Sequence, residues 1–172
     1  MKTKEIVFAA LMLAVGMVLH AITPPIFGGV KPDFLLASMF IAIVSQPKLA
    51  NTFLIGTVAG ILAAMTTGFP GGQIPNIIDK LISAYFVLFI ITLLKNQLKP
   101  LIIGALGFVA TIVSGIAFLS SALVIVGLPA PLSALFVAVV LPTAIANTFV
   151  TYAFYKVYVV LYQRSTSFVK AT

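Results

Sequence analysis

The chain has 172 residues, of which 62% are hydrophobic and only 8% are charged, and its formal net charge is +7. Soluble domains carry about 25% charged residues, so the composition excludes an ordinary soluble fold and indicates a protein of the lipid bilayer. With no cysteine and a single histidine, the sequence excludes disulfides and thiolate metal sites, and we expect neither a metal centre nor another cofactor.

Apolar runs separated by proline, glycine and lysine predict the elements along the chain. The runs cover residues 5–23, 33–46, 49–67, 77–94, 101–127 and 132–162. Runs of about 20 apolar residues suit membrane-spanning helices. We therefore expect an all-α integral membrane protein with six transmembrane helices and a single domain over residues 1–172.

Three of these runs need comment. The first is interpreted as a retained span rather than a signal peptide. It lacks a small-x-small cleavage site, and its apolar residues are followed by His20 and Pro24. The second is short for a full span, so we expect it either to be steeply placed or to be partly covered by other parts of the protein. The last is long, and Pro142 is expected to kink it.

The distribution of charge predicts the orientation. With a cytoplasmic N-terminus, eight of the ten basic residues and Glu5 fall on the inner side. This excess follows the positive-inside rule, so both termini are expected in the cytoplasm. The basic residues form no face outside the apolar runs, so they do not indicate a nucleic-acid partner. The outer side then holds a balanced set of charges: Lys31, Asp33, Asp79 and Lys80.

These four charges lie in two similar outer motifs. Residues 28–33 read Gly-Gly-Val-Lys-Pro-Asp, and residues 71–80 read Gly-Gly-Gln-Ile-Pro-Asn-Ile-Ile-Asp-Lys. Charge at the mouth of a membrane helix is expensive and is usually retained for function. Pairs of opposite charge around a partly desolvated pocket suit a zwitterion, which needs an anion for its ammonium and a cation for its carboxylate.

Helix capping explains the same acids without a ligand. Asn76 can serve as the N-cap of the fourth helix, with Asp79 at the third position of its first turn. Likewise, Pro32 fits the first position of the second helix, with Asp33 in the first turn. The two interpretations are compatible, because a capping carboxylate can still accept a ligand ammonium.

Other polar and aromatic residues extend the candidate site. Asn147 lies inside the sixth run, where an unpaired amide costs a few kcal/mol, so it bonds either another helix or a ligand. Gln73 and Asn76 are further amides near the outer motifs, and His20 fits a packing role better than a ligand contact. Aromatic side chains near the outer turns could enclose an aromatic ligand.

Small residues recur at helical spacing. Gly56 and Gly60 on the third run predict close packing within the bundle, whereas Ala10 and Ala14 on the first run suit either packing or a flat surface for another subunit. No arrangement typical of a catalytic site is present, and no nucleotide-binding motif occurs. The sequence therefore predicts a protein that is not an enzyme and that cannot use ATP by itself.

The two outer motifs, together with the length and the six-run plan, resemble the bacterial tryptophan transporter family of Firmicutes. That family is similar to the substrate-binding (S) components of energy-coupling factor (ECF) importers. The resemblance implies a six-helix protein of the plasma membrane that binds its substrate on the outer side and topples within the membrane. It also implies a transmembrane coupling subunit and two ATPase subunits as partners, with docking through Ala10 and Ala14.

On this resemblance the expected substrate is tryptophan. We assign Asp79 to its ammonium, and Lys80 or Lys31 to its carboxylate. Asn147, Gln73 or Asn76 would meet the indole N–H, and Phe69, Phe27 or Tyr85 would lie against the ring. Asp33 and His20 complete the candidate set.

The complete absence of tryptophan from the chain suits an importer that is needed during tryptophan starvation. Three alternatives stay open: an S component for another small aromatic or vitamin-like substrate, a self-sufficient secondary amino-acid transporter, and a membrane scaffold. A secondary transporter would carry a buried carboxylate near the bilayer midplane, and all three acids are expected near helix ends.

Overall fold

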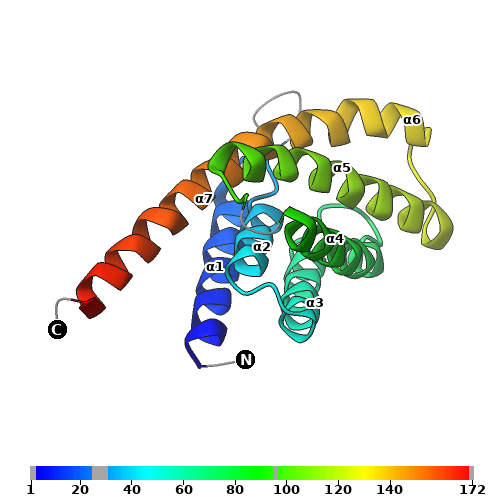
Figure 1. Ribbon diagram of the computed structural model, residues 1–172. Helices are drawn as coiled ribbons and strands as arrows, with labels where there is room; N and C mark the ends of the chain where they lie inside the picture. Colours follow the sequence, from blue (N-terminus) through cyan, green and yellow to red (C-terminus); the bar gives the residue numbers. More distant parts are fainter. Residues whose placement is uncertain (1–2, 25–30, 95–96, 171–172) are drawn as a thin grey trace.

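The computed structural model describes residues 3–24, 31–94 and 97–170, with residues 162–170 by their backbone alone. The described residues form helices and connecting turns (Figure 1). Their bounds are α1 Thr3–Ile22, α2 Phe34–Ser45, α3 Leu49–Met65, α4 Gln73–Leu94, α5 Pro100–Ile125, α6 Leu132–Leu135, the π-helical segment η1 Phe136–Val140, and α7 Leu141–Lys170. The predicted all-helical membrane architecture is confirmed at this level.

Within the described residues, four helical stretches are long and apolar enough to cross a membrane: Thr3–Ile22, Gln73–Leu94, Pro100–Ile125 and Leu132–Leu161. The α2 and α3 helices are also apolar but shorter. The chain is therefore a multi-pass membrane protein. The orientation of its termini stays a prediction.

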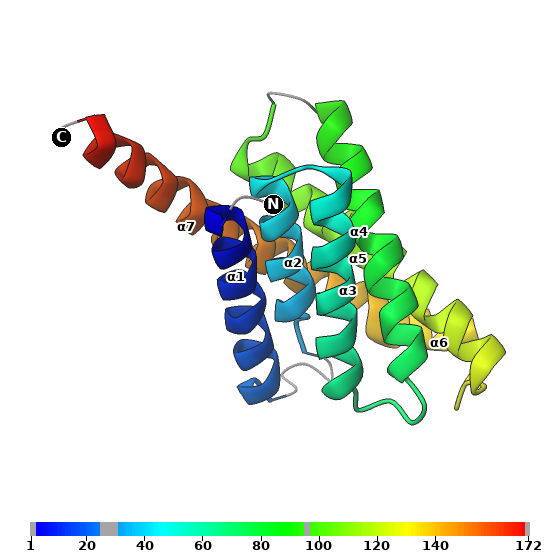
Figure 2. The same ribbon diagram turned by 90° about the horizontal axis from the view of Figure 1, so that it is seen from below.

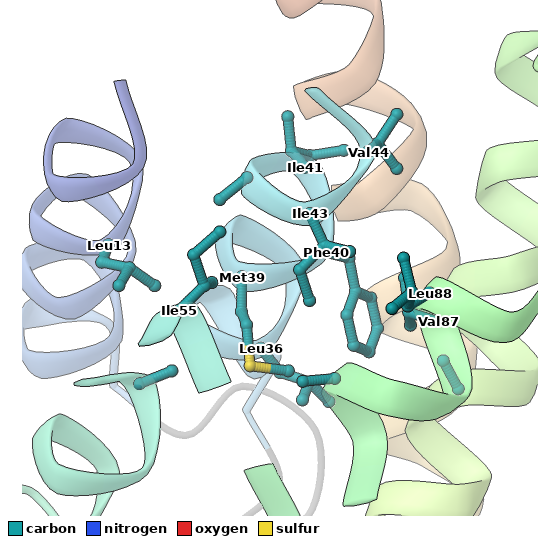
Figure 3. Close-up of a cluster of buried hydrophobic side chains, with 14 of the residues drawn as sticks. Leu13, Leu36, Met39, Phe40, Ile41, Ile43, Val44, Ile55, Val87 and Leu88 are labelled. Carbon is teal, nitrogen blue, oxygen red and sulfur yellow. The ribbon is translucent and has the colours of Figure 1, made fainter. Parts of the chain in front are cut away.

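The short α2 helix lies at the centre of the bundle. Every residue from Leu35 to Val44 is buried, and side chains of α1, α3 and α4 surround it (Figure 3). Twelve residues span only about 18 Å of helix, so α2 reaches its full burial through protein contacts rather than through lipid. Of the two alternatives for this short run, cover by other parts of the protein is confirmed.

The remaining helices pack around α2 in chain order. The helices α1 to α4 run side by side, while α5 and α7 lie against each other on another side of the bundle (Figure 2). Gly56 and Gly60 permit a close approach of α3 to α4, because a β-carbon at Gly60 would lie 3.0 Å from the Ile77 Cα. The predicted packing role of these glycines is confirmed.

The last helix is irregular where Pro142 predicts a kink. Pro142 has no N–H to donate to the carbonyl of Ala138, so the regular ladder fails there. The chain widens into one π-helical turn, in which the Leu141 N–H donates to the Phe136 carbonyl. The irregularity thus precedes the proline.

The prediction for the start of α4 is wrong. The helix begins at Gln73, and Asn76 lies inside its first turn, where its side chain donates to the Gly72 carbonyl at 2.7 Å. Asp79 therefore lies in the second turn and does not cap the helix. The prediction for the start of α2 differs by two positions, because the first helical residue is Phe34 and not Pro32. Asp33 is itself the N-cap, and its carboxylate accepts from the Leu36 N–H at 2.9 Å.

Polar contacts join the helices at the end of the bundle where α1 begins and α2 ends. Gln46 donates to the Glu5 carbonyl at 2.9 Å, and Lys48 pairs with the Glu5 carboxylate at 3.0 Å. These contacts hold the start of α1 against the α2–α3 turn. We refer to this end as the closed end of the bundle.

Candidate ligand-binding cavity

A cavity of about 450 Å³ opens at the end of the bundle where α1 ends and α2 begins. This volume lies within the range of about 300–1,000 Å³ typical of small-molecule sites. Its charged and polar lining consists of His20, Lys31, Asp33, Thr66, Thr67, Asn76, Asp79, Lys80, Thr111, Ser114 and Thr143. Its apolar lining consists of Leu36, Ala63, Gly68, Phe69, Gly115, Phe118, Leu119, Leu135, Val139 and Val140.

Lys80 links the two outer motifs. Its ammonium lies 2.7 Å from the carboxylate of Asp79 and 3.1 Å from that of Asp33, which is 47 positions away in the chain. The Lys80 side chain is only 3% exposed. A lysine can be buried at this level because two carboxylates compensate its charge.

Asp79 is the most enclosed acid of the site, with 3% of its side chain exposed. One carboxylate oxygen accepts from Lys80, and the other accepts from the Ser83 hydroxyl at 3.0 Å. Each oxygen of the Asp79 carboxylate therefore already has a protein donor.

Asp33 is more accessible, with 21% of its side chain exposed. One carboxylate oxygen caps α2, and the other accepts from Lys80. The Nδ1 atom of His20 lies 3.7 Å away from the carboxylate. The Asp33 backbone N–H donates to the side-chain oxygen of Asn147 at 2.9 Å, so α7 fixes the position of the cap.

Lys31 lies two residues before Asp33 and also lines the cavity. Its ammonium donates to the backbone carbonyl of His20 at 2.8 Å. No carboxylate of the described residues forms an ion pair with it. Lys31 is therefore the cation of the cavity that is best placed to receive a new anion.

An aromatic pair forms another part of the wall. Phe69, in the turn after α3, lies edge-on to Phe118 of α5, with ring centroids 5.4 Å apart. Gly71 holds this turn in place: it has a φ of +72°, and a β-carbon there would lie 2.5 Å from a Val126 methyl. A residue without a side chain is thus required both for the backbone angle and for the approach to α5.

The structure brings together seven of the site residues expected from the sequence: His20, Lys31, Asp33, Phe69, Asn76, Asp79 and Lys80 all line the cavity. Gln73 is exposed and Tyr85 is 37% exposed on α4, and neither lines it. Asn147 is fully buried behind the wall, where it bonds Asp33 and donates to Thr111 at 3.0 Å. Phe27 lies outside the described residues. Ala10 and Ala14 are exposed on α1.

Sequence reasoning missed one wall of the cavity. The α5 residues Thr111, Ser114, Gly115, Phe118 and Leu119 recur at spacings of three and four, which places them on one helical face. Two hydroxyls on this face of a membrane helix were the available signal. Their number on a single stripe could have indicated a wall that faces a polar site.

Comparisons with known proteins agree on one family. The sequence model of the family described as Tryptophan transporter TrpP matches residues 2–162. A Bacillus subtilis protein named probable tryptophan transport protein is 48% identical over 171 residues, which cover 99% of both chains. Proteins of the same name from Clostridium acetobutylicum and Clostridium perfringens are 47% and 41% identical, over 87% and 90% of this chain and 88% and 91% of their own length. No solved structure matches the chain.

Proposed function

The chain belongs to the tryptophan transporter family, and on this premise we propose that it is the tryptophan-binding subunit of an ATP-driven ECF-type importer in the plasma membrane. The cavity is the binding site. The proposal rests above all on the charge balance of the cavity.

Two lysines and two aspartates line the cavity, so their formal charges cancel. A zwitterion such as tryptophan enters this site without leaving net charge in a poorly solvated region, where unpaired charge is expensive. A vitamin-like ligand with net negative charge would leave that charge uncompensated. The charge balance therefore favours a zwitterionic amino acid over a ligand with net charge.

The remaining lining fits an indole ring. Phe69 and Phe118 offer aromatic surface, and aromatic pairs contribute about 0.5–1.5 kcal/mol beyond the area they bury. The hydroxyls of Thr66, Thr67 and Thr143 and the Asn76 side chain line the same cavity. Any of these oxygens can accept the indole N–H, which only donates hydrogen bonds.

Two features support dependence on ATPase partners. The sequence contains no nucleotide-binding motif, and Ala10 and Ala14 present small side chains on the exposed surface of α1. Small residues at this spacing allow another helix to approach closely within lipid. In the proposed mechanism, tryptophan binds from outside, the partner subunits hydrolyse ATP, and the subunit topples to expose the site to the cytoplasm.

One observation favours a second candidate, a self-sufficient secondary transporter. Asp79 was expected near a helix end, but it lies six residues beyond the first residue of α4, which corresponds to about 9 Å along the helix. A buried carboxylate paired with a lysine is the kind of group that couples transport to protons.

Uptake by proteoliposomes separates the two candidates. Liposomes that contain only this chain are expected to bind labelled tryptophan without concentrating it. Liposomes that also contain a coupling subunit and ATPases are expected to concentrate it when ATP is enclosed. Accumulation by the chain alone, driven by a proton or sodium gradient, would replace the ECF proposal with the second candidate.

A further inference from the structure

The charged groups of the cavity are arranged unequally, and this inequality assigns the two ends of a bound amino acid. We infer that Asp33 receives the ammonium and Lys31 receives the carboxylate. Asp79 and Lys80 form an ion pair that is complete without a ligand, and this pair positions Asp33. This assignment rests on the proposed function. It replaces the sequence-based expectation that Asp79 binds the ammonium.

The two aspartates differ in exposure and in how far their carboxylates are already hydrogen-bonded. The Asp79 carboxylate already accepts from Lys80 and Ser83, one donor on each oxygen, and its side chain is 3% exposed. Asp33 has seven times that exposure, with one oxygen on the α2 cap and the other shared with Lys80. A carboxylate has about four lone-pair positions, so Asp33 retains acceptor capacity on its accessible side.

The two lysines differ in the number of carboxylates that already pair with their ammonium groups. A ligand carboxylate placed on Lys80 would stand beside two other carboxylates at 2.7 and 3.1 Å from the same ammonium. Like charges that close repel strongly in a poorly solvated site. Among the described residues, Lys31 donates only to the His20 carbonyl and pairs with no carboxylate, so a ligand carboxylate does not share this ammonium with an acid of the protein.

The net charge of the linked groups also matches the two ends of an amino acid. Asp33, Asp79 and Lys80 comprise two carboxylates and one ammonium, which leave one net negative charge for a ligand cation. Lys31 provides the matching positive charge. Lys31 and Asp33 are two positions apart in the chain, both line the cavity, and both side chains approach His20. This proximity suits an α-amino acid, whose ammonium and carboxylate share one carbon.

Truncated ligands test the assignment directly. Tryptamine lacks the carboxylate, and indole-3-propionate lacks the ammonium. Ligand-induced thermal shifts at millimolar concentrations detect even weak binding, because stabilisation follows RT ln(1 + [L]/Kd). We expect Lys31→Gln to weaken tryptophan binding at least tenfold without weakening tryptamine binding. We expect Asp33→Asn to weaken tryptophan binding at least tenfold without weakening that of indole-3-propionate.

We expect the Asp33→Asn variant to fold, because asparagine caps a helix about as well as aspartate does. The Lys99→Gln variant removes an exposed lysine at the closed end of the bundle, and Glu5→Gln removes an ion pair there. Both controls are expected to bind all three ligands as the wild type does.

The outcomes are distinguishable. If tryptophan does not stabilise the wild-type chain, the proposed function fails. If the wild type binds tryptophan but Asp79→Asn, rather than Asp33→Asn, selectively spares indole-3-propionate, the ammonium belongs to Asp79 and this inference is overturned. Wild-type tryptophan affinity in Lys31→Gln would overturn the carboxylate assignment in the same way.

Discussion

The side-chain oxygen of Asn147 accepts a hydrogen bond from the backbone N–H of Asp33 at 2.9 Å, across 114 positions of the chain. The same amide donates to the Thr111 hydroxyl at 3.0 Å. A single fully buried side chain therefore joins α7 to the cap of α2 and to the α5 wall of the cavity. This relationship makes Asn147 a positioning residue for the proposed site.

Replacement of Asn147 by leucine is expected to destabilise the protein and weaken ligand binding. The change leaves the Asp33 N–H without its acceptor, and an unsatisfied buried group costs about 1–3 kcal/mol. The Thr111 hydroxyl loses one donor but still donates to the Gly107 carbonyl. Thermal unfolding in detergent measures the loss. Thr148→Val on the same helix is the control, because the Thr148 hydroxyl bonds only the Ala144 carbonyl of its own helix. Equal stability of the two variants would contradict the role of Asn147.

Gly71→Ala is expected to lower the thermal midpoint and the tryptophan affinity together. Its φ of +72° costs about 1–2 kcal/mol for a residue with a β-carbon, and that carbon would lie 2.5 Å from Val126. Gly68→Ala in the same turn is the matched control for the thermal midpoint, because nothing lies within 4 Å of a β-carbon there. If both alanine variants have the same thermal midpoint, the turn does not depend on this packing.

Phe118→Leu is expected to weaken tryptophan binding about two- to tenfold, which corresponds to the 0.5–1.5 kcal/mol of an aromatic contact. Titration of the purified chain with tryptophan measures the change. Phe89→Leu removes a ring that is exposed on the outside of α4, and it should leave the affinity unchanged. An unchanged affinity in Phe118→Leu would place the indole ring elsewhere.

Phenylalanine at Ala10 and Ala14 is expected to abolish assembly with a coupling subunit while tryptophan binding is retained. Both alanines are exposed, so the larger side chains extend into lipid without disturbing the bundle. Co-purification with the coupling and ATPase subunits measures assembly. Ala105→Phe, at an exposed position of α5, is the control. Normal assembly of the Ala10 and Ala14 variant would exclude this surface of α1 as the docking site.

Much of the fold could be predicted from the sequence, because apolar runs and proline–glycine breaks determine membrane helices directly. The start of α4 could not, since Asn76 offers good capping chemistry and Pro75 favours an early helical position. The helix instead begins at Gln73, where proline is still tolerated in the first turn. Local propensity does not decide between two adjacent starts that differ by a few residues.

The site was predictable in its residues but not in its partners. The outer motifs contain Asp33 and Lys80, yet only folding shows that their charged groups meet at 3.1 Å. Helical geometry explains two misplaced residues: Tyr85 is six positions after Asp79, which turns it about 120° away from the cavity face, and Gln73 lies at the exposed start of α4. Such rotations become predictable only when the buried face of the helix is known.

Calorimetric titration of the purified chain with L-tryptophan is the most direct test of whether the cavity binds tryptophan through Lys31 and Asp33. We expect saturable binding of one tryptophan per chain to the wild type, and loss of that binding in the double variant Lys31→Gln/Asp33→Asn at the same concentrations. An absence of saturable binding to the wild type, or wild-type affinity in a folded double variant, would contradict it.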